Sequence, residues 1–206
     1  MTTRGLIQIY DQIHEKNGDE QRLLTNIYVH GDMYPKNGIM CDVFKFLGNK
    51  TLSSGFMPKK IFIQVNGMDD LAAQIITYLK SSYSTSMKRL GYDGGDIAAG
   101  YVYIYPNIKL RDLDVRYIYK ISLNNRLYEL ANMAPGELAN MANMAPGELA
   151  YIPSLSAVGE GVDIPLTELG IKVYRYEWTQ DNAKPRLIFS GKLGEYVKKY
   201  CIAETA

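Results

Sequence analysis

The chain has 206 residues, which is enough for one hydrophobic core and too few for two domains of ordinary size. Apolar residues make up 47% and charged residues 22%, so the composition argues against disorder of the whole chain. The 23 lysines and arginines only just exceed the 22 acidic residues, and without a basic excess we expect no nucleic-acid partner.

The sequence predicts a cytoplasmic protein. Its N-terminus lacks the charged and apolar regions of a signal peptide. No stretch approaches the run of about 18 apolar residues that a membrane-spanning helix needs, so we expect no membrane partner.

The cysteines and histidines suggest no special chemistry. Cys41 and Cys201 lie at apolar-periodic helix positions, so we expect two reduced, buried thiols that pack as small hydrophobic groups. His14 and His30 show no metal-ligand spacing. We therefore predict no metal site and no cofactor.

In chain order, the first predicted elements are a β-hairpin and a helix. Residues 4–10 and 21–29 have strand composition, and Asn17-Gly18-Asp19 between them is a hairpin turn signal. Pro35 then disfavours helical backbone at the residue before it. A helix is expected over 38–47, where apolar residues recur at helical spacing.

The middle of the chain predicts a short strand, a helix and a loop. Residues 61–65 form a short apolar run that fits a buried strand. A helix is expected over 69–80, because Asp69 and Asp70 in its first turn suit the positive end of the helix dipole. Residues 81–100 are rich in serine and glycine and are expected to form a loop.

Four further strands and a last helix complete the predicted fold. Strands are expected over 101–105, 115–123, 171–178 and 186–190, and a helix over 192–201. In 115–123 apolar residues alternate with basic ones, which is typical of a strand with one buried face. Together these elements predict an α+β fold: a mainly antiparallel sheet of about six or seven strands with three covering helices.

Residues 131–139 and 142–150 are identical in sequence. The unit is too short for a solenoid repeat, and each copy contains a Pro-Gly turn signal. A loop expansion of this kind is tolerated because the cost of closing a loop rises slowly with its length. We therefore expect a single domain, 1–206, with a surface insertion at about 129–150.

Tyrosine is unusually common, with 17 residues that lie mostly in the strand-like runs. Tyrosine suits half-buried sheet surfaces because its ring buries area while its hydroxyl stays hydrated. The simpler interpretation is a set of sheet faces packed under helices. The alternative is an exposed aromatic platform on which a base or nucleotide stacks.

A series of short motifs carries a family resemblance. They are Thr3-Arg-Gly-Leu-Ile7, His30-Gly-Asp-Met-Tyr-Pro35, Asn66-Gly-Met-Asp-Asp-Leu-Ala-Ala-Gln74, a tyrosine-rich strand that ends in Tyr105-Pro106, and Leu187-Ile-Phe-Ser-Gly191. Their order resembles a family of uncharacterised proteins common in phages and also found in bacteria and archaea. The resemblance covers most of residues 1–125 and 171–201. It implies a phage-like origin and brings no activity with it.

The predicted hairpin would bring the start of the first strand close to the turn at residues 30–35. Arg4 and Asp32 could then form an ion pair that holds the start of the chain. Alternatively, Arg4, His30, Asp32 and Tyr34 could bind a small anionic or polar ligand, because arginine offers a planar fork for carboxylate or phosphate and histidine titrates near neutral pH.

Three functional hypotheses follow from these features. The first is a non-catalytic accessory protein of phage or virus type that binds a host protein or a small polar ligand, in the host cytoplasm if phage-encoded. The second is an N-terminal-nucleophile-type amidohydrolase, since removal of Met1 would leave Thr2 with a free α-amine to act as its base. The third is a self-assembling structural component, a homo-oligomer, suggested by tyrosine richness and near-zero net charge.

Overall fold

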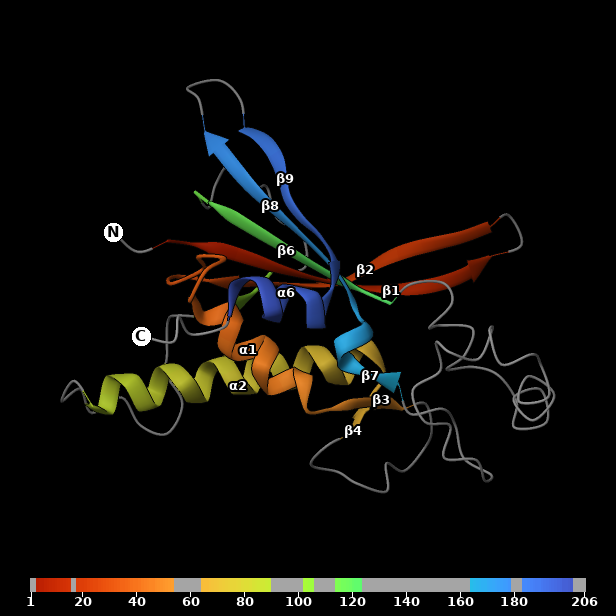
Figure 1. Ribbon diagram of the computed structural model, residues 1–206, viewed down its shortest axis with the longest axis horizontal. Helices are drawn as coiled ribbons and strands as arrows, with labels where there is room; N and C mark the ends of the chain where they lie inside the picture. Colours follow the sequence, from red (N-terminus) through yellow and green to blue (C-terminus); the bar gives the residue numbers. More distant parts are fainter. Residues whose placement is uncertain are drawn as a thin grey trace.

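A six-stranded sheet forms the framework of the protein in the computed structural model (Figure 1). The structure describes residues 3–15, 18–53, 64–89, 102–105, 114–123, 164–178 and 183–201. Within these ranges the strand order is β5-β2-β1-β6-β8-β9, and neighbours are antiparallel except for the parallel pair β1 and β6. The strands are β1 (Gly5–Glu15), β2 (Gly18–Val29), β5 (Val102–Ile104), β6 (Tyr117–Ser122), β8 (Gly170–Trp178) and β9 (Ala183–Lys192).

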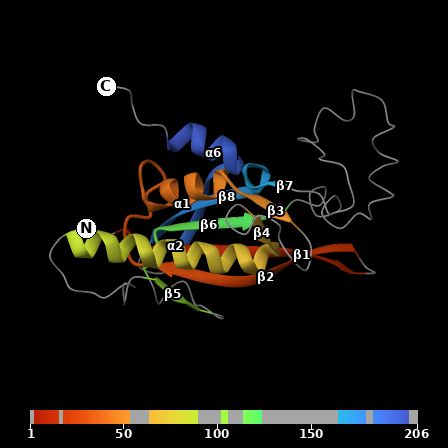
Figure 2. The ribbon, with the colours of Figure 1, turned by 90° about the horizontal axis from the view of Figure 1, so that it is seen from below.

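Among the described residues, three helices pack on the same side of this sheet. They are α1 (Ile39–Gly48), α2 (Gly67–Arg89) and α6 (Leu193–Tyr200). Figure 2 shows α2 along the β2 side of the sheet and α6 along the β8 side, with α1 between them. The described elements thus confirm the α+β class, with a mostly antiparallel sheet and three helices.

A second, smaller sheet lies beside the helices. Its strands are β4 (Gln64–Asn66), β3 (Thr51–Ser53) and β7 (Ile164–Pro165), in the order β4-β3-β7. A 3-10 turn, η2 (Leu166–Glu168), links β7 to β8. Neither β3 nor β7 was predicted from the sequence, because strands of two or three residues are too short to show a periodic pattern.

Helix positions agree with the predictions except at the end of α2. The expected helices over 38–47 and 192–201 correspond to α1 and α6. The helix expected over 69–80 continues to Arg89, so the loop predicted from residue 81 is wrong over its first part. Serine, threonine and tyrosine are only mildly poorer helix formers than alanine, and the first glycine after the predicted end is Gly91. None of the described helices is both long and apolar enough to cross a membrane.

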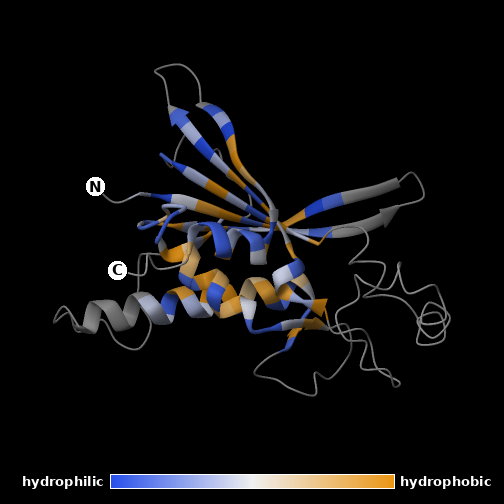
Figure 3. Cartoon of the chain, in the orientation of Figure 1, coloured by the Kyte–Doolittle hydropathy of each residue, from blue (hydrophilic) through white to orange (hydrophobic). Residues whose placement is uncertain are grey.

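The main core lies between the sheet and the helices, where Figure 3 shows hydrophobic residues on both layers. Its centre is aromatic. The rings of Phe44 on α1 and Tyr196 on α6 meet edge to face with centroids 5.0 Å apart, and Tyr119 on β6 lies 6.2 Å from Phe44. All three side chains are fully buried, so this cluster joins both helices to the middle of the sheet.

The turn between β2 and α1 is held by this aromatic cluster. Tyr119 donates a hydrogen bond from its hydroxyl to the carbonyl oxygen of Met33 (3.1 Å), and Tyr196 donates one to the carbonyl oxygen of Pro35 (2.8 Å). From the other side, the N–H of Met33 donates to the carbonyl oxygen of Thr3 (3.1 Å). The turn therefore has a fixed place beside the start of β1.

Gly38, which precedes α1, permits the tight return of this turn. A Cβ atom there would collide with the backbone oxygens of Tyr34 and Asp32. We expect Gly38→Ala to lower the free energy of unfolding by about 2 kcal/mol, the usual cost of forcing atoms into a filled space. Gly48→Ala, at the end of α1, is the control, because the nearest atom to its Cβ would be 4.0 Å away and alanine favours helix. Chemical denaturation that gives Gly38→Ala the same stability as Gly48→Ala would contradict this account.

The expectation of two reduced thiols is wrong in this structure, because Cys41 and Cys201 form a disulfide. Both residues are 2% exposed, as expected for buried cysteines. Antiparallel packing of α1 and α6 brings their Cα atoms to 5.1 Å, which is within the normal range for a disulfide. The two residues are 160 positions apart in sequence, so no local pattern indicated the pairing.

Strand β6 has two buried faces, whereas its sequence predicted one. Tyr119 and Ile121 face the helices and belong to the main core. Ile118, on the opposite face, is only 1% exposed and packs with Leu6 and Val115 in a second cluster. The alternation in residues 115–123 did not reveal the second buried face. Val115 has the spacing of the helix-facing residues yet packs in the second cluster, and Ile118 alternates with polar residues. The predicted insertion at 129–150 lies outside the described residues.

Candidate functional site

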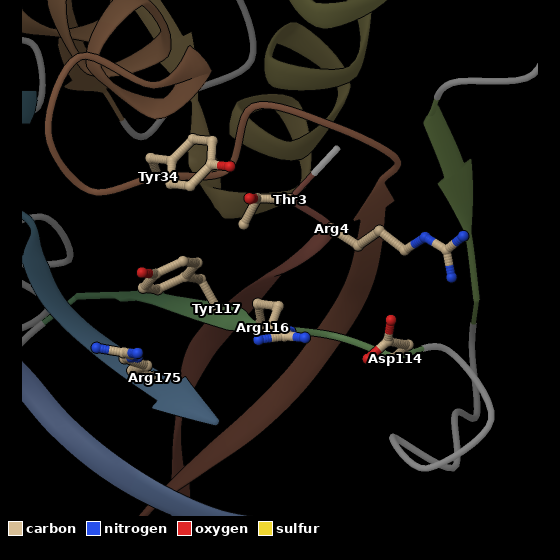
Figure 4. A pocket seen from close by; sticks show the side chains of 7 residues that line it. All are labelled: Thr3, Arg4, Tyr34, Asp114, Arg116, Tyr117 and Arg175. Atoms are coloured by element: carbon tan, nitrogen blue, oxygen red, sulfur yellow. The ribbon is translucent and has the colours of Figure 1, made fainter. Parts of the chain in front are cut away.

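A pocket of about 420 Å³ opens where β1 and β6 begin (Figure 4). This volume falls within the range of small-molecule sites, about 300–1,000 Å³. The described residues that line it are Thr3, Arg4, Tyr34, Asp114, Arg116, Tyr117 and Arg175. They come from four separate parts of the chain, so the pocket exists only in the folded protein.

Backbone pairing sets Arg4 beside Arg116 and places Arg175 on the next strand. The N–H of Arg116 donates to the carbonyl oxygen of Arg4 (3.0 Å), which continues the parallel pairing of β1 with β6. On the other side of β6, Arg175 lies opposite Tyr117 in the register with β8. The pocket thus takes one arginine from each of three neighbouring chain segments at the same end of the sheet.

The charge of the lining is positive. The lining contains three arginines and one carboxylate, that of Asp114. Arg4 and Arg116 form no salt bridge with any residue that the structure describes, and Arg175 makes a loose one with Glu177 at 4.0 Å. Both partners of that pair are more than half exposed, so it contributes little to stability. The guanidinium groups consequently retain hydrogen-bonding capacity for an anion.

Arg4 and Asp114 also act on a neighbouring tyrosine. Burial raises the pKa of Tyr28; the positive charge of Arg4 opposes this rise, and the negative charge of Asp114 adds to it. Both charged groups are therefore close enough to affect the Tyr28 hydroxyl. Figure 4 shows the side chain of Arg4 directed away from Tyr34, on the side of the pocket where Asp114 lies.

Two aromatic side chains form the opposite side of the pocket. The rings of Tyr34 and Tyr117 lie 6.4 Å apart between centroids and are tilted by 58°. Tyr34 is 43% exposed, and Figure 4 shows both rings on the side away from Arg4, with Thr3 and Arg116 in between. The pocket therefore has two tyrosine rings and Arg175 on one side and Arg4 with Asp114 on the other, and Arg116 lies between them.

The structure separates the four residues that the sequence placed in one site. Arg4 and Tyr34 line the pocket, whereas His30 and Asp32 are not among its lining residues. The His30 ring lies 6.3 Å from that of Tyr28. Asp32 is exposed, with a left-handed backbone (φ 56°), and its carbonyl oxygen accepts the N–H of Ile39. Arg4 and Asp32 form no ion pair with each other.

No sequence pattern indicated the other lining residues. Arg116 and Arg175 were seen only as the polar positions of alternating strands, and Asp114 carried no signal at all. Their placement depends on the parallel pairing of β1 with β6, which no local pattern encodes. Thr2, the predicted nucleophile, lies outside the described residues, and within the described part of the chain no group of three potential metal ligands occurs.

Comparison with known proteins adds nothing to this geometry. No protein-family model matches the sequence, and no curated protein or solved structure is similar to it.

Proposed function

We propose that this protein is a non-catalytic binding protein that holds a small anionic ligand in the pocket at the start of β1 and β6. The observation that carries the proposal is the set of three arginines against one carboxylate in the lining. Arginine binds phosphate and carboxylate groups through paired N–H donors, and charge-assisted hydrogen bonds of this kind are the strong ones. The resemblance of its motifs to those of an uncharacterised phage family fits an accessory role in an infected host.

The first experiment compares thermal stability with and without inorganic pyrophosphate, a compact anion to which several arginines can donate hydrogen bonds at once. Pyrophosphate at 100 times its dissociation constant should add about 2.7 kcal/mol to the free energy of unfolding. Arg116→Gln should weaken its affinity by about 10- to 100-fold, because a hydrogen bond to a charged group contributes about 1.5–3 kcal/mol. Isothermal calorimetry on the two proteins gives the dissociation constants.

Two variants separate specific binding from general charge effects. Lys198→Gln removes the same charge from an exposed position on α6, away from the pocket, and should leave the affinity unchanged. Arg175→Lys keeps the pocket charge but loses the planar fork, so we expect weaker binding than in the unaltered protein. Equal affinity for pyrophosphate in all of these proteins, or no binding at all, would show that the pocket is not an anion site.

A further inference from the structure

The sheet face turned away from the helices, here called the outer face, carries an aromatic and apolar strip that crosses all six strands. Cross-strand register places one residue of each strand in this row. In strand order, the residues are Tyr103, Tyr28, Leu6, Ile118, Tyr174 and Leu187. Six strands at a spacing of about 4.8 Å make the strip on the order of 24 Å long.

The strip is buried in its middle and exposed at its two ends. Leu6, Ile118 and Tyr28 are 0%, 1% and 7% exposed and belong to one buried cluster. Tyr103 at one end is 41% exposed, and Leu187 at the other is 50% exposed. The Tyr28 ring lies 6.0 Å from that of Tyr103 and meets Tyr105 edge to face at 6.1 Å. The Tyr28 and Tyr103 rings thus hold each other in place, and part of the Tyr103 ring remains accessible.

Basic residues flank the strip on both sides. On one side Lys120 and Lys172 are paired across β6 and β8, and on the other Arg4 and Arg116 are joined through their backbones. The Nζ atom of Lys120 lies 5.3 Å from the ring centroid of Tyr174 and 5.5 Å from that of Tyr10.

Acidic residues are absent from these positions of the described strands. One row beside the strip holds the two lysines, and its other residues are Asn26, Gln8 and Ser190. The row on the other side holds the two arginines, and its other residues are Tyr176 and Pro185. The whole chain has a formal net charge of only +1. Asp114 lies at the border of the face, near Tyr28. Folding has therefore concentrated positive charge on one face of a protein that is close to neutral.

We propose that the outer face of the sheet binds single-stranded nucleic acid, with bases on the tyrosine strip and phosphates against the flanking basic residues. Unpaired bases stack on aromatic side chains, and a positive groove or face beside them holds the backbone. The two exposed ends of the strip lie on the order of 24 Å apart, a distance that several consecutive nucleotides of a single strand would span. A duplex would hide the base faces that the strip requires, so single strands are preferred.

This site is distinct from the anion pocket, although Arg4 and Arg116 border both. It rests on Tyr103, Tyr174 and the lysine pair, none of which lines the pocket. Arg175 lines the pocket and lies opposite Tyr117, not in any of the three outer rows. Variants of these residues therefore test the two sites separately.

The test measures fluorescence anisotropy of a labelled 12-nucleotide oligo-dT over a range of salt concentrations. The unaltered protein should bind it at 50 mM salt. The double variant Lys120→Gln/Lys172→Gln should bind more weakly, with a slope of log affinity against log salt flatter by about 1.4, since each lost phosphate contact on a single strand contributes about 0.7. Tyr103→Ala should reduce affinity by about 5- to 100-fold without changing that slope.

Lys198→Gln/Lys199→Gln is the matched control, because it removes the same charge from exposed positions of α6 on the helix side. It should leave oligo-dT affinity unchanged, as should Arg175→Gln. Thermal melting of each variant verifies that it folds. The proposal is overturned if the unaltered protein does not bind oligo-dT, or if either control loses as much affinity as the Lys120/Lys172 variant. A DNA duplex that displaces oligo-dT as well as unlabelled oligo-dT does would also overturn the proposal. Equal displacement by polyglutamate of similar charge would overturn it as well, by pointing to an acidic protein partner.

Discussion

Replacing both Cys41 and Cys201 with alanine is expected to lower the free energy of unfolding by about 3 kcal/mol. Their disulfide closes a loop of 160 residues, and a cross-link of this span restricts the unfolded chain strongly. It also joins the first turn of α1 to the end of α6. Urea denaturation of the double variant and of the oxidised protein gives the difference directly.

Reductant provides the control for this prediction. The unaltered protein denatured in the presence of dithiothreitol should lose the same stability as the double variant, whereas the double variant should not respond to dithiothreitol. Identical denaturation curves for the unaltered protein with and without reductant would contradict the disulfide. The N–H of Asn37 donates to the carbonyl oxygen of Tyr200 beside this link, so the disulfide and this hydrogen bond together tie the start of α1 to the end of α6.

Raising the pH from 10 to 11 is expected to lower the free energy of unfolding by about 2 kcal/mol, through two buried tyrosines. Burial raises the pKa of both Tyr119 and Tyr196 above the ordinary value of 10.0. For Tyr119 the neighbouring Tyr196 hydroxyl raises the pKa further, whereas the hydrogen bond with Tyr119 acts on Tyr196 in the opposite direction.

The sign of this effect follows from proton linkage. Above pH 10 the unfolded chain releases protons that the folded protein still holds on these two hydroxyls. The stabilisation is fully present below pH 10 and declines as the pH rises, by about 1.4 kcal/mol per pH unit for each tyrosine. Denaturation with urea at a series of pH values from 9 to 11 measures this slope.

Tyr119→Phe/Tyr196→Phe tests the assignment. This double variant should start less stable, because the carbonyl oxygens of Met33 and Pro35 lose their donors, and its alkaline slope should be flatter. Ile27→Val, in the same core, costs about 1 kcal/mol by loss of packing and should keep the slope of the unaltered protein. If the phenylalanine variant and Ile27→Val have the same slope, other groups cause the alkaline loss of stability.

The sequence alone determined the local elements and the fold class. The period of 3.6 residues in α1 and α6, and the alternation in β6 and β8, follow from which side of each element must be apolar. Glycine and proline residues together marked the turn at residues 30–38. The end of α2 was misplaced because residues 81–89 contain neither a stop signal nor a clear helical stripe.

Only the tertiary structure decided which of these elements meet. A hydrophobic pattern predicts that one face of an element is buried but does not indicate which element packs against it. Because the cost of closing a loop rises only slowly with its length, elements distant in sequence compete with near ones as packing partners. The pairing of β1 with β6 therefore set Arg116 beside Arg4, and the packing of α1 on α6 joined Cys41 to Cys201. The same pairings gathered basic residues and tyrosines on one sheet face, although the chain as a whole has almost balanced charge.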